Sequence, residues 1–275
     1  MVTAIKKQPK ERPIKVNNFT TIESEYGPFI VNRHCAYQAE VLIKTGQPHI
    51  QEELNKILAV INQLPENSIT IDAGANIGLV AIPIAKQVAA KRGTVYAFEA
   101  QRMMSYALCG SAALNDLENL IIHNTALGAT TGTLNGEAPD YSKPQDFGLF
   151  SLAEQDTTQP KTQSQTTQAV QTTTSATIPV TIPVTTIDTL ALPRLDFLKI
   201  DVEGMEIDVL EGGRQSIKEF LPWCWIEYWK TDIEAIKAQF AGLDYQFYIM
   251  DQLNMLCAPT QKLEKSALTI NAKKA

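Results

Sequence analysis

The sequence of 275 residues lacks long apolar runs and an excess of positive charge, and each absence excludes a class of protein. No run reaches the roughly 18 apolar residues of a membrane-spanning helix. The basic, proline-containing residues 1–15 have no apolar centre, so they are not a signal peptide. We therefore expect a cytoplasmic protein. A net charge of −6 argues against a general nucleic-acid partner, which would show a basic patch.

Cysteine and histidine are also scarce. The four cysteines show no C-x-x-C spacing and lie among apolar or small residues, which predicts buried free thiols. They are Cys35, Cys109, Cys224 and Cys257. Of the three histidines, His123 is expected inside a strand. His34 and His49 precede the expected core, where either one is a possible base or a surface residue.

The most informative stretch, residues 69–78, lacks the G-x-G-x-x-G spacing of a dinucleotide-binding turn. It reads I-T-I-D-A-G-A-N-I-G, a β-branched run that ends in an acid and is followed by small residues and an apolar helix. This order predicts the ligand crevice of a doubly wound α/β sheet. Gly74 and Gly78 are expected to let the backbone approach a ligand closely, because a Cβ there would intrude.

Two acids at strand ends indicate the ligand. Asp72 would repel a pyrophosphate, but it suits a ligand that carries an ammonium and a sulfonium group. Glu99 follows the next strand, over 94–98, at the position where an acid holds a ribose diol. Together these positions predict S-adenosylmethionine as the cofactor. The alternative interpretation is that Asp72 ends a plain strand and that Glu99 is a solvated acid.

Strands and helices alternate along most of the chain, which predicts a parallel sheet with right-handed crossovers. The expected strands cover residues 18–22, 28–31, 69–72, 94–98, 119–126, 195–201, 222–229, 245–250 and 255–258. The expected helices cover residues 51–62, 79–90, 102–114, 186–190, 203–212 and 232–240. The last two strands are expected to form an antiparallel hairpin at the sheet edge.

Residues 154–177 contain nine threonines, six glutamines and no aromatic residue. Such a composition buries too little apolar surface to offset the entropy of ordering, so we expect disorder or an exposed loop. The segment is either a substrate lid or a tolerated insertion, and its deletion should leave cofactor binding intact. Residues 177–184 contain P-V-T-I-P-V and are predicted as an edge strand, because proline donates no ladder hydrogen bond.

Six motifs together resemble the FkbM family of S-adenosylmethionine-dependent methyltransferases. They are I-D-A-G-A-N-I-G at 71–78, F-E at 98–99, N-T-A-L-G at 124–128, I-D-T-L at 187–190, K-I-D-V-E-G-M-E at 199–206 and V-L-E-G-G at 209–213. The resemblance runs from about residue 50 to residue 258. It implies a Rossmann-like class I fold: a seven-stranded, mostly parallel sheet with an antiparallel last strand and helices on both faces.

The sequence pattern predicts a division of the chain, and the resemblance implies a set of cofactor residues. A flexible arm (1–15) and capping strands and helix (16–66) would precede the methyltransferase domain (67–261), and a loose tail (262–275) would follow it. The residues implied to bind the cofactor are Asp72, Gly74, Asn76, Gly78, Glu99, Thr125 and Ala126. Glu99 would hold the ribose, and Thr125 and Ala126 would lie near the adenine.

Methyl transfer requires alignment of donor and acceptor, and a hydroxyl or amide acceptor must also lose a proton. Asp201, at the end of its strand, is the candidate base, and Glu203 is the second candidate catalytic residue. Alternatively, Asp201 and Glu203, with Glu227, hold a divalent cation that acidifies the acceptor. Glu206 is expected to stabilise the start of the following helix through its dipole.

Three hypotheses follow from these patterns. The first is methyl transfer to a hydroxyl of a sugar or other small secondary metabolite, the acceptors that most family members use. The second is N-methylation of peptide side chains in natural-product maturation, and the third is a non-catalytic nucleotide-binding module. We expect a small-molecule or sugar acceptor and neither a nucleic-acid nor a membrane partner, and the sequence leaves the oligomeric state open.

Overall fold

The computed structural model describes residues 17–149, 178–270 and 272–275. The arm expected over residues 1–15 and the Thr/Gln-rich segment 154–177 lie outside the described residues. Within these ranges, no helix combines the length and the apolar character that crossing a membrane requires.

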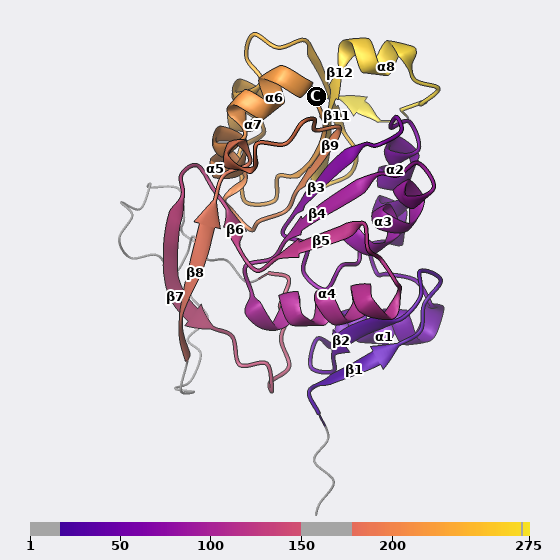
Figure 1. The fold of residues 1–275 in the computed structure, drawn as a ribbon, viewed down its shortest axis with the longest axis vertical. Helices are drawn as coiled ribbons and strands as arrows, with labels where there is room; N and C mark the ends of the chain where they lie inside the picture. Colours follow the sequence, from indigo (N-terminus) through magenta and orange to yellow (C-terminus); the bar gives the residue numbers. More distant parts are fainter. Residues whose placement is uncertain (1–16, 150–177, 271) are drawn as a thin grey trace, which may run out of the picture.

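A central sheet of eight strands organises the fold (Figure 1). Its strands are β3 (Ile69–Ala73), β4 (Thr94–Phe98), β5 (Leu120–His123), β9 (Phe197–Ile200), β10 (Trp223–Glu227), β11 (Tyr245–Ile249), β12 (Asn254–Pro259) and β13 (Lys273–Lys274). Their order is β13-β11-β12-β10-β9-β3-β4-β5. The five strands from β10 to β5 are parallel, and β12 pairs antiparallel with both β10 and β11. The predicted fold class is confirmed, with the two-residue β13 as an additional edge strand.

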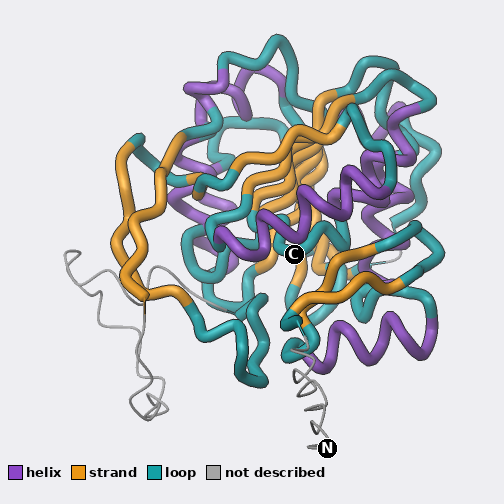
Figure 2. Tube along the Cα trace, turned by 60° about the horizontal axis from the view of Figure 1, so that its bottom comes forward, coloured by secondary structure: helices purple, strands orange, loops and turns teal. Residues whose placement is uncertain are grey.

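Helices cover both faces of this sheet (Figure 2). On one face lie α2 (Gln51–Ile61), α3 (Ala81–Ala89) and α4 (Arg102–Leu114), whose apolar residues share a core with Val95 and Ala97 of β4. On the other face lie α5 (Glu206–Gly212), α6 (Arg214–Phe220) and α7 (Ile233–Gln239), which pack with Ile69 and Ile71 of β3. The crevice is therefore built between two apolar layers.

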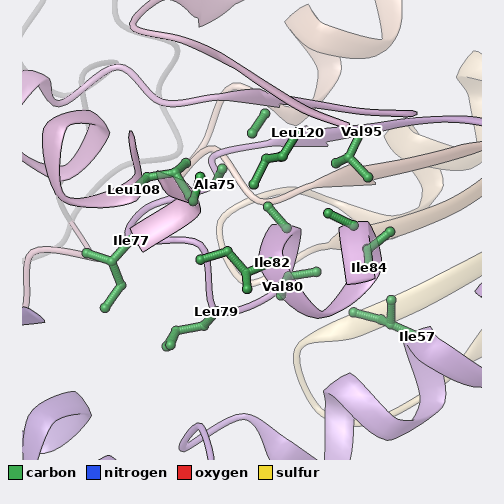
Figure 3. Packing of buried hydrophobic residues seen from close by; sticks show 14 of the residues in the cluster. Ile57, Ala75, Ile77, Leu79, Val80, Ile82, Ile84, Val95, Leu108 and Leu120 are labelled. Atoms are coloured by element: carbon green, nitrogen blue, oxygen red, sulfur yellow. The ribbon is translucent and has the colours of Figure 1, made fainter. Parts of the chain in front are cut away.

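The apolar sequence of α3 fixes this helix against the sheet. Val80, Ile82 and Ile84 are buried, and Ile57 of α2 packs into the same core (Figure 3). Burial of each such side chain stabilises the fold by roughly 1.5–3 kcal/mol. Pro83 is the third residue of α3. At that position its missing N–H has no intrahelical partner to lose.

The N-terminal segment forms a small layer beside α4. The two expected strands are present as β1 (Phe19–Ile22) and β2 (Phe29–Asn32), which pair antiparallel, and α1 (Ala36–Thr45) follows them. The backbone N–H of Ile30 donates to Ser111 Oγ on α4 at 2.8 Å, which fastens the strand pair to the main body.

A second sheet projects from the domain (Figure 2). It contains β6 (Ala126–Leu127), β7 (Gly132–Ala138) and β8 (Ile178–Thr185) in the order β6-β8-β7. The prediction that β8 is an edge strand is wrong, because β8 is the middle strand. Its prolines lie where β7 is the sole neighbour, since β6 pairs only with Val184 and Thr185. Proline is thus tolerated on the unpaired side.

Two further features differ from the expectations. The segment expected as a loose tail contains the end of α8 (Thr260–Lys265) and the strand β13. Cys35, Cys224 and Cys257 are buried free cysteines as expected, whereas Cys109 is exposed on α4. The helical stop at Gly212–Gly213 is confirmed, because α5 ends there and α6 begins at Arg214.

Candidate active site

A cavity of about 320 Å³ lies at the carboxyl ends of β3, β4, β9 and β10. It brings together eight of the nine residues proposed from the sequence. These eight are Asp72, Gly74, Asn76, Glu99, Thr125, Ala126, Asp201 and Glu203. Gly78 does not line the cavity. The predicted residues therefore line the crevice at the carboxyl ends of the parallel strands, where ligands bind in open α/β sheets.

The two turn glycines allow close packing around the crevice. Both have positive φ angles, 83° at Gly74 and 93° at Gly78. A Cβ on Gly74 would lie 1.7 Å from the Asp201 carbonyl oxygen, and a Cβ on Gly78 would lie 2.4 Å from Leu108 Cδ1. These glycines therefore let the turn pack against the end of β9 and against α4, and Gly74 also lines the cavity.

Asp72 is completely buried beneath the cavity, in register with Lys199 on β9. Burial raises the pKa of Asp72 to about 6, although the nearby Lys199 ammonium opposes this shift. Lys199 Nζ lies 3.8 Å from Asp72 Oδ1. Neither Asp72 oxygen accepts a hydrogen bond of standard geometry among the described residues. The Ala81 backbone N–H nevertheless lowers the pKa.

Lys199 is a buried cation that the sequence analysis did not assign. Its Nζ lies 3.0 Å from Asp201 Oδ2. Burial disfavours the charged ammonium, but the carboxylates of Asp201, Asp72 and Glu53 outweigh burial and raise the Lys199 pKa. The signal was present in K-I-D: residues two apart on a strand share one face. Lys199 therefore links the carboxylates at the ends of β3 and β9.

Glu99 is held by the backbone around it. Its Oε2 accepts the Asn76 N–H at 2.7 Å, and its Oε1 accepts the Gln101 N–H at 2.6 Å. Burial raises the pKa of Glu99 to about 7, and the two N–H groups oppose that shift. Each carboxylate oxygen has a further lone pair, so Glu99 is able to accept hydrogen bonds from a ligand in the cavity.

Asn76 has a left-handed backbone conformation, with φ of 49°, which Asn tolerates better than most residues. Its side-chain Oδ1 is buried and has no hydrogen-bond partner among the described residues. Such an orphaned acceptor is unfavourable unless a ligand supplies a donor. Thr125 and Ala126 line the cavity between β5 and the second sheet.

Three carboxylates meet beside Lys199. Asp201, Glu203 and Glu227 each place an oxygen so that these atoms lie within 4.8 Å of one another. Burial and the charges of Asp201 and Glu203 raise the pKa of Glu227 to about 9. Two of the three acids are paired with lysines. Lys230 Nζ lies 3.0 Å from Glu203 Oε2, and Lys199 Nζ lies 3.0 Å from Asp201 Oδ2.

Glu206 accepts hydrogen bonds from the loop that precedes α5. Its Oε1 receives the N–H groups of Gly204 at 3.0 Å and Val202 at 3.3 Å, and Thr231 Oγ1 donates to its Oε2. This geometry at the first residue of α5 agrees with the stabilising role expected for Glu206.

Residues outside the matched motifs complete the walls of the cavity. Glu53 of α2 accepts the Trp225 Nε1–H at 3.0 Å and lines the cavity with His49. His49 and His123 are part-buried. Asp146 also lines the cavity, and its loop is anchored because Gln101 Nε2 donates a hydrogen bond to the Phe147 carbonyl at 2.7 Å. These residues come from segments with no motif, so no sequence signal placed them here.

The strand order and the crevice at the carboxyl ends of the parallel strands define a Rossmann-like fold. A family model described as the methyltransferase FkbM domain matches residues 72–252. The chain therefore belongs to the FkbM methyltransferase family.

The chain is also similar to individual proteins. The chain is 25% identical over 225 residues to methyltransferase sdnD of Sordaria araneosa, and the match covers 73% of this chain and 85% of that protein. An FkbM methyltransferase structure from Methylobacillus flagellatus is 18% identical with a TM-score of 0.46, and the match covers 70% of this chain but only 44% of that one. An O-methyltransferase structure from Thermotoga maritima is 11% identical with a TM-score of 0.41, over 87% of this chain and 77% of that one.

Proposed function

We propose that this methyltransferase transfers the methyl group to a hydroxyl of a sugar or other small secondary metabolite, and that Asp201 is the base. The observation that carries the proposal is the position of Asp201 at the end of β9, where it lines the cavity beside the buried cation Lys199. A hydroxyl acceptor must lose its proton as the new bond forms, so a positioned base is required.

The cavity residues fit S-adenosylmethionine. Glu99 has free acceptor capacity for the ribose hydroxyls, and the orphaned Asn76 Oδ1 suits the ammonium of the methionine end. The buried Asp72 carboxylate adds negative potential beneath that end, partly balanced by Lys199. When bound, the cofactor supplies a methyl group already activated by its sulfonium. The contribution of the protein is then alignment and proton removal.

The acidic cluster supports a direct route for the proton. The Lys199 ammonium lies 3.0 Å from Asp201 Oδ2, which holds the Asp201 carboxylate in place at the edge of the cavity. Glu227, with its raised pKa, is protonated at neutral pH and forms a side-chain hydrogen bond with Asp201. Glu227 therefore helps to fix the position of the Asp201 carboxylate, which lines the cavity where an acceptor hydroxyl would bind.

A competing route uses the same cluster. Three carboxylate oxygens within 4.8 Å of one another suit a divalent cation, which would acidify the acceptor. We favour the base because Lys199 and Lys230 already balance Asp201 and Glu203. A chelator distinguishes the two routes.

The proposal is tested by mass spectrometry of products after incubation with S-adenosylmethionine that carries a deuterated methyl group. Acceptor pools of glycosides, hydroxylated polyketides and amide-bearing peptides are supplied in parallel. Label on a hydroxyl oxygen, lost in Asp201→Asn, is the expected result. Label on an amide nitrogen of the peptides would instead support side-chain N-methylation and overturn the O-methylation proposal.

A further inference from the structure

A second hollow lies at the end of the sheet opposite the active-site cavity. It has a volume of about 510 Å³. We call it the basal groove and define it by Arg194, Asp196, Glu219, Trp223, Lys262 and Lys265. It forms where β9 and β10 begin, and α6 and α8 bound it near the top of Figure 1. None of these residues takes part in the proposed chemistry.

Arg194 and Asp196 form a self-contained pair in this groove. Arg194 Nε lies 2.7 Å from Asp196 Oδ2, and Arg194 Nη2 lies 2.7 Å from Asp196 Oδ1, a bidentate arrangement. Asp196 Oδ2 also accepts the Ile69 N–H at 2.8 Å. The direct contacts of Asp196 are therefore with Arg194 and with the start of β3.

Lys262 has no such counter-ion. Its Nζ donates to the Phe220 carbonyl at 3.0 Å. Within the described part of the chain, no carboxylate lies within 4.0 Å of that Nζ atom. Burial lowers the pKa of Lys262, an effect that the more distant Asp196 carboxylate opposes. An ammonium has three donors, so two remain for a ligand.

Lys265 adds a second positive charge to the side of the groove that contains Lys262. It lies three residues after Lys262 on α8, a spacing that places both side chains on one helical face. The groove lining then holds three cations against two carboxylates, one of which belongs to the Arg194 pair. The other, Glu219, is exposed at the end of α6. The groove lining therefore carries a net positive charge, and its two lysines are the part-buried Lys262 and the exposed Lys265.

We propose that the basal groove binds a small oxyanion, a phosphate or a carboxylate group of a metabolite, between Lys262 and Lys265. The anion would complete the donor set of Lys262 and supply the countercharge that its part-buried ammonium lacks. Trp223, which lines the groove, begins the strand that ends at Glu227 in the acidic cluster.

The test uses the full chain and three probes at constant ionic strength: inorganic phosphate, pyrophosphate and citrate. Calorimetry and thermal unfolding measure binding, because a ligand that binds only the folded state raises the melting temperature. We expect saturable binding of at least one probe, weakened by about tenfold or more in Lys262→Met and in Lys265→Met. Binding of the phosphates alone identifies a phosphate site, and binding of citrate alone identifies a carboxylate site.

Lys218→Met is the matched control, because Lys218 lies on α6 next to Glu219 but does not line the groove. It should bind the probe as the unmodified protein does. S-adenosylhomocysteine binding checks that each variant is folded and keeps this test separate from that of the active site. The proposal would be overturned if none of the three probes showed saturable binding. It would also be overturned if both groove variants bound the probe with the same affinity as the unmodified protein.

Discussion

The Nζ atom of Lys199 lies 3.0 Å from Oδ2 of Asp201, two residues further along the chain. The same Nζ lies 3.8 Å from Asp72 Oδ1, so one buried ammonium serves the carboxylates of two neighbouring strands. This relationship changes the interpretation of Asp72. The charge of Asp72 is partly balanced inside the protein by Lys199. A positively charged methyl donor would therefore lie near the linked side chains of Asp72, Lys199 and Asp201 rather than near a single carboxylate.

Removal of this ammonium should destabilise the fold. In Lys199→Met, the fully buried Asp72 loses its cation, and an uncompensated buried charge costs roughly 3–5 kcal/mol. Denaturant unfolding measures the loss at neutral pH. The double variant Asp72→Asn/Lys199→Met should be more stable than Lys199→Met alone, because it buries no unpaired Asp72 charge.

The control is Lys44→Met, which removes the exposed ion pair with Glu40. Exposed pairs contribute little, so its free energy of unfolding should change by about 0.5 kcal/mol or less. Simple additivity of the Asp72 and Lys199 substitutions would show that the two side chains do not interact.

Cofactor affinity should rise with pH through the titration of Glu99. Because the pKa of Glu99 is raised to about 7 by burial, its carboxyl group is largely protonated below that pH. Ionised oxygens accept ribose hydroxyl bonds better, so S-adenosylhomocysteine should bind up to about tenfold more tightly at about pH 8 than at about pH 6. Calorimetry measures this slope, and Glu99→Gln should bind weakly with a flat profile. An unchanged slope in Glu99→Gln would assign the titration to another group.

Asp201→Asn should lower turnover by about 100-fold or more, because general-base catalysis contributes at least that factor. Cofactor affinity should stay within about threefold, since the proposed role of Asp201 concerns the acceptor proton. Glu234→Gln, on the exposed side of α7, is the control and should keep full turnover. Unchanged turnover in Asp201→Asn would eliminate the base assignment.

Removal of divalent cations should leave the reaction rate unchanged. Lys199 and Lys230 already balance two acids of the cluster, so the base mechanism needs no cation. The measurement is methyl transfer before and after treatment with a chelator, followed by addition of Mg²⁺. A rate that collapses with the chelator and returns with Mg²⁺ would support the cation route through Asp201, Glu203 and Glu227.

Gly74→Ala should both destabilise the protein and impair cofactor binding. The new Cβ would lie 1.7 Å from the Asp201 carbonyl oxygen, so β3 and β9 must separate. Gly242 has a similar φ, 79°, but a Cβ added there would meet no atom within 4 Å, which makes Gly242→Ala the matched control. In the control, backbone strain alone should lower the free energy of unfolding, by roughly 1–2 kcal/mol, and in Gly74→Ala the decrease should be larger. Equal losses in denaturant unfolding would contradict the packing role of Gly74.

The strand ends were predictable because they follow a local rule. A buried β-branched run followed by an acid and small residues identifies β3, and the same alternation identifies β4 and β9. Parallel strands place their carboxyl ends at one edge, so Asp72, Glu99 and Asp201 were expected to meet without further information. The structure brings all three to one cavity.

The remaining features depend on contacts between distant segments. Glu53 reaches the cavity because Trp225, 172 residues further along the chain, donates to it. The central position of β8 depends on β6, which is only two residues long and gives no sequence signal. Cys109 is exposed because α4 turns that position outward, although its neighbours in sequence are small or apolar. Only the packed structure fixes such relationships.

A crystal structure with S-adenosylhomocysteine tests the central claim most directly. We predict that the ribose hydroxyls contact Glu99, that the amino group of the methionine end contacts Asn76 Oδ1, and that the sulfur faces the side of the cavity bounded by Asp201. A ligand seated away from Glu99 and Asn76, or a sulfur directed away from Asp201, would contradict the account.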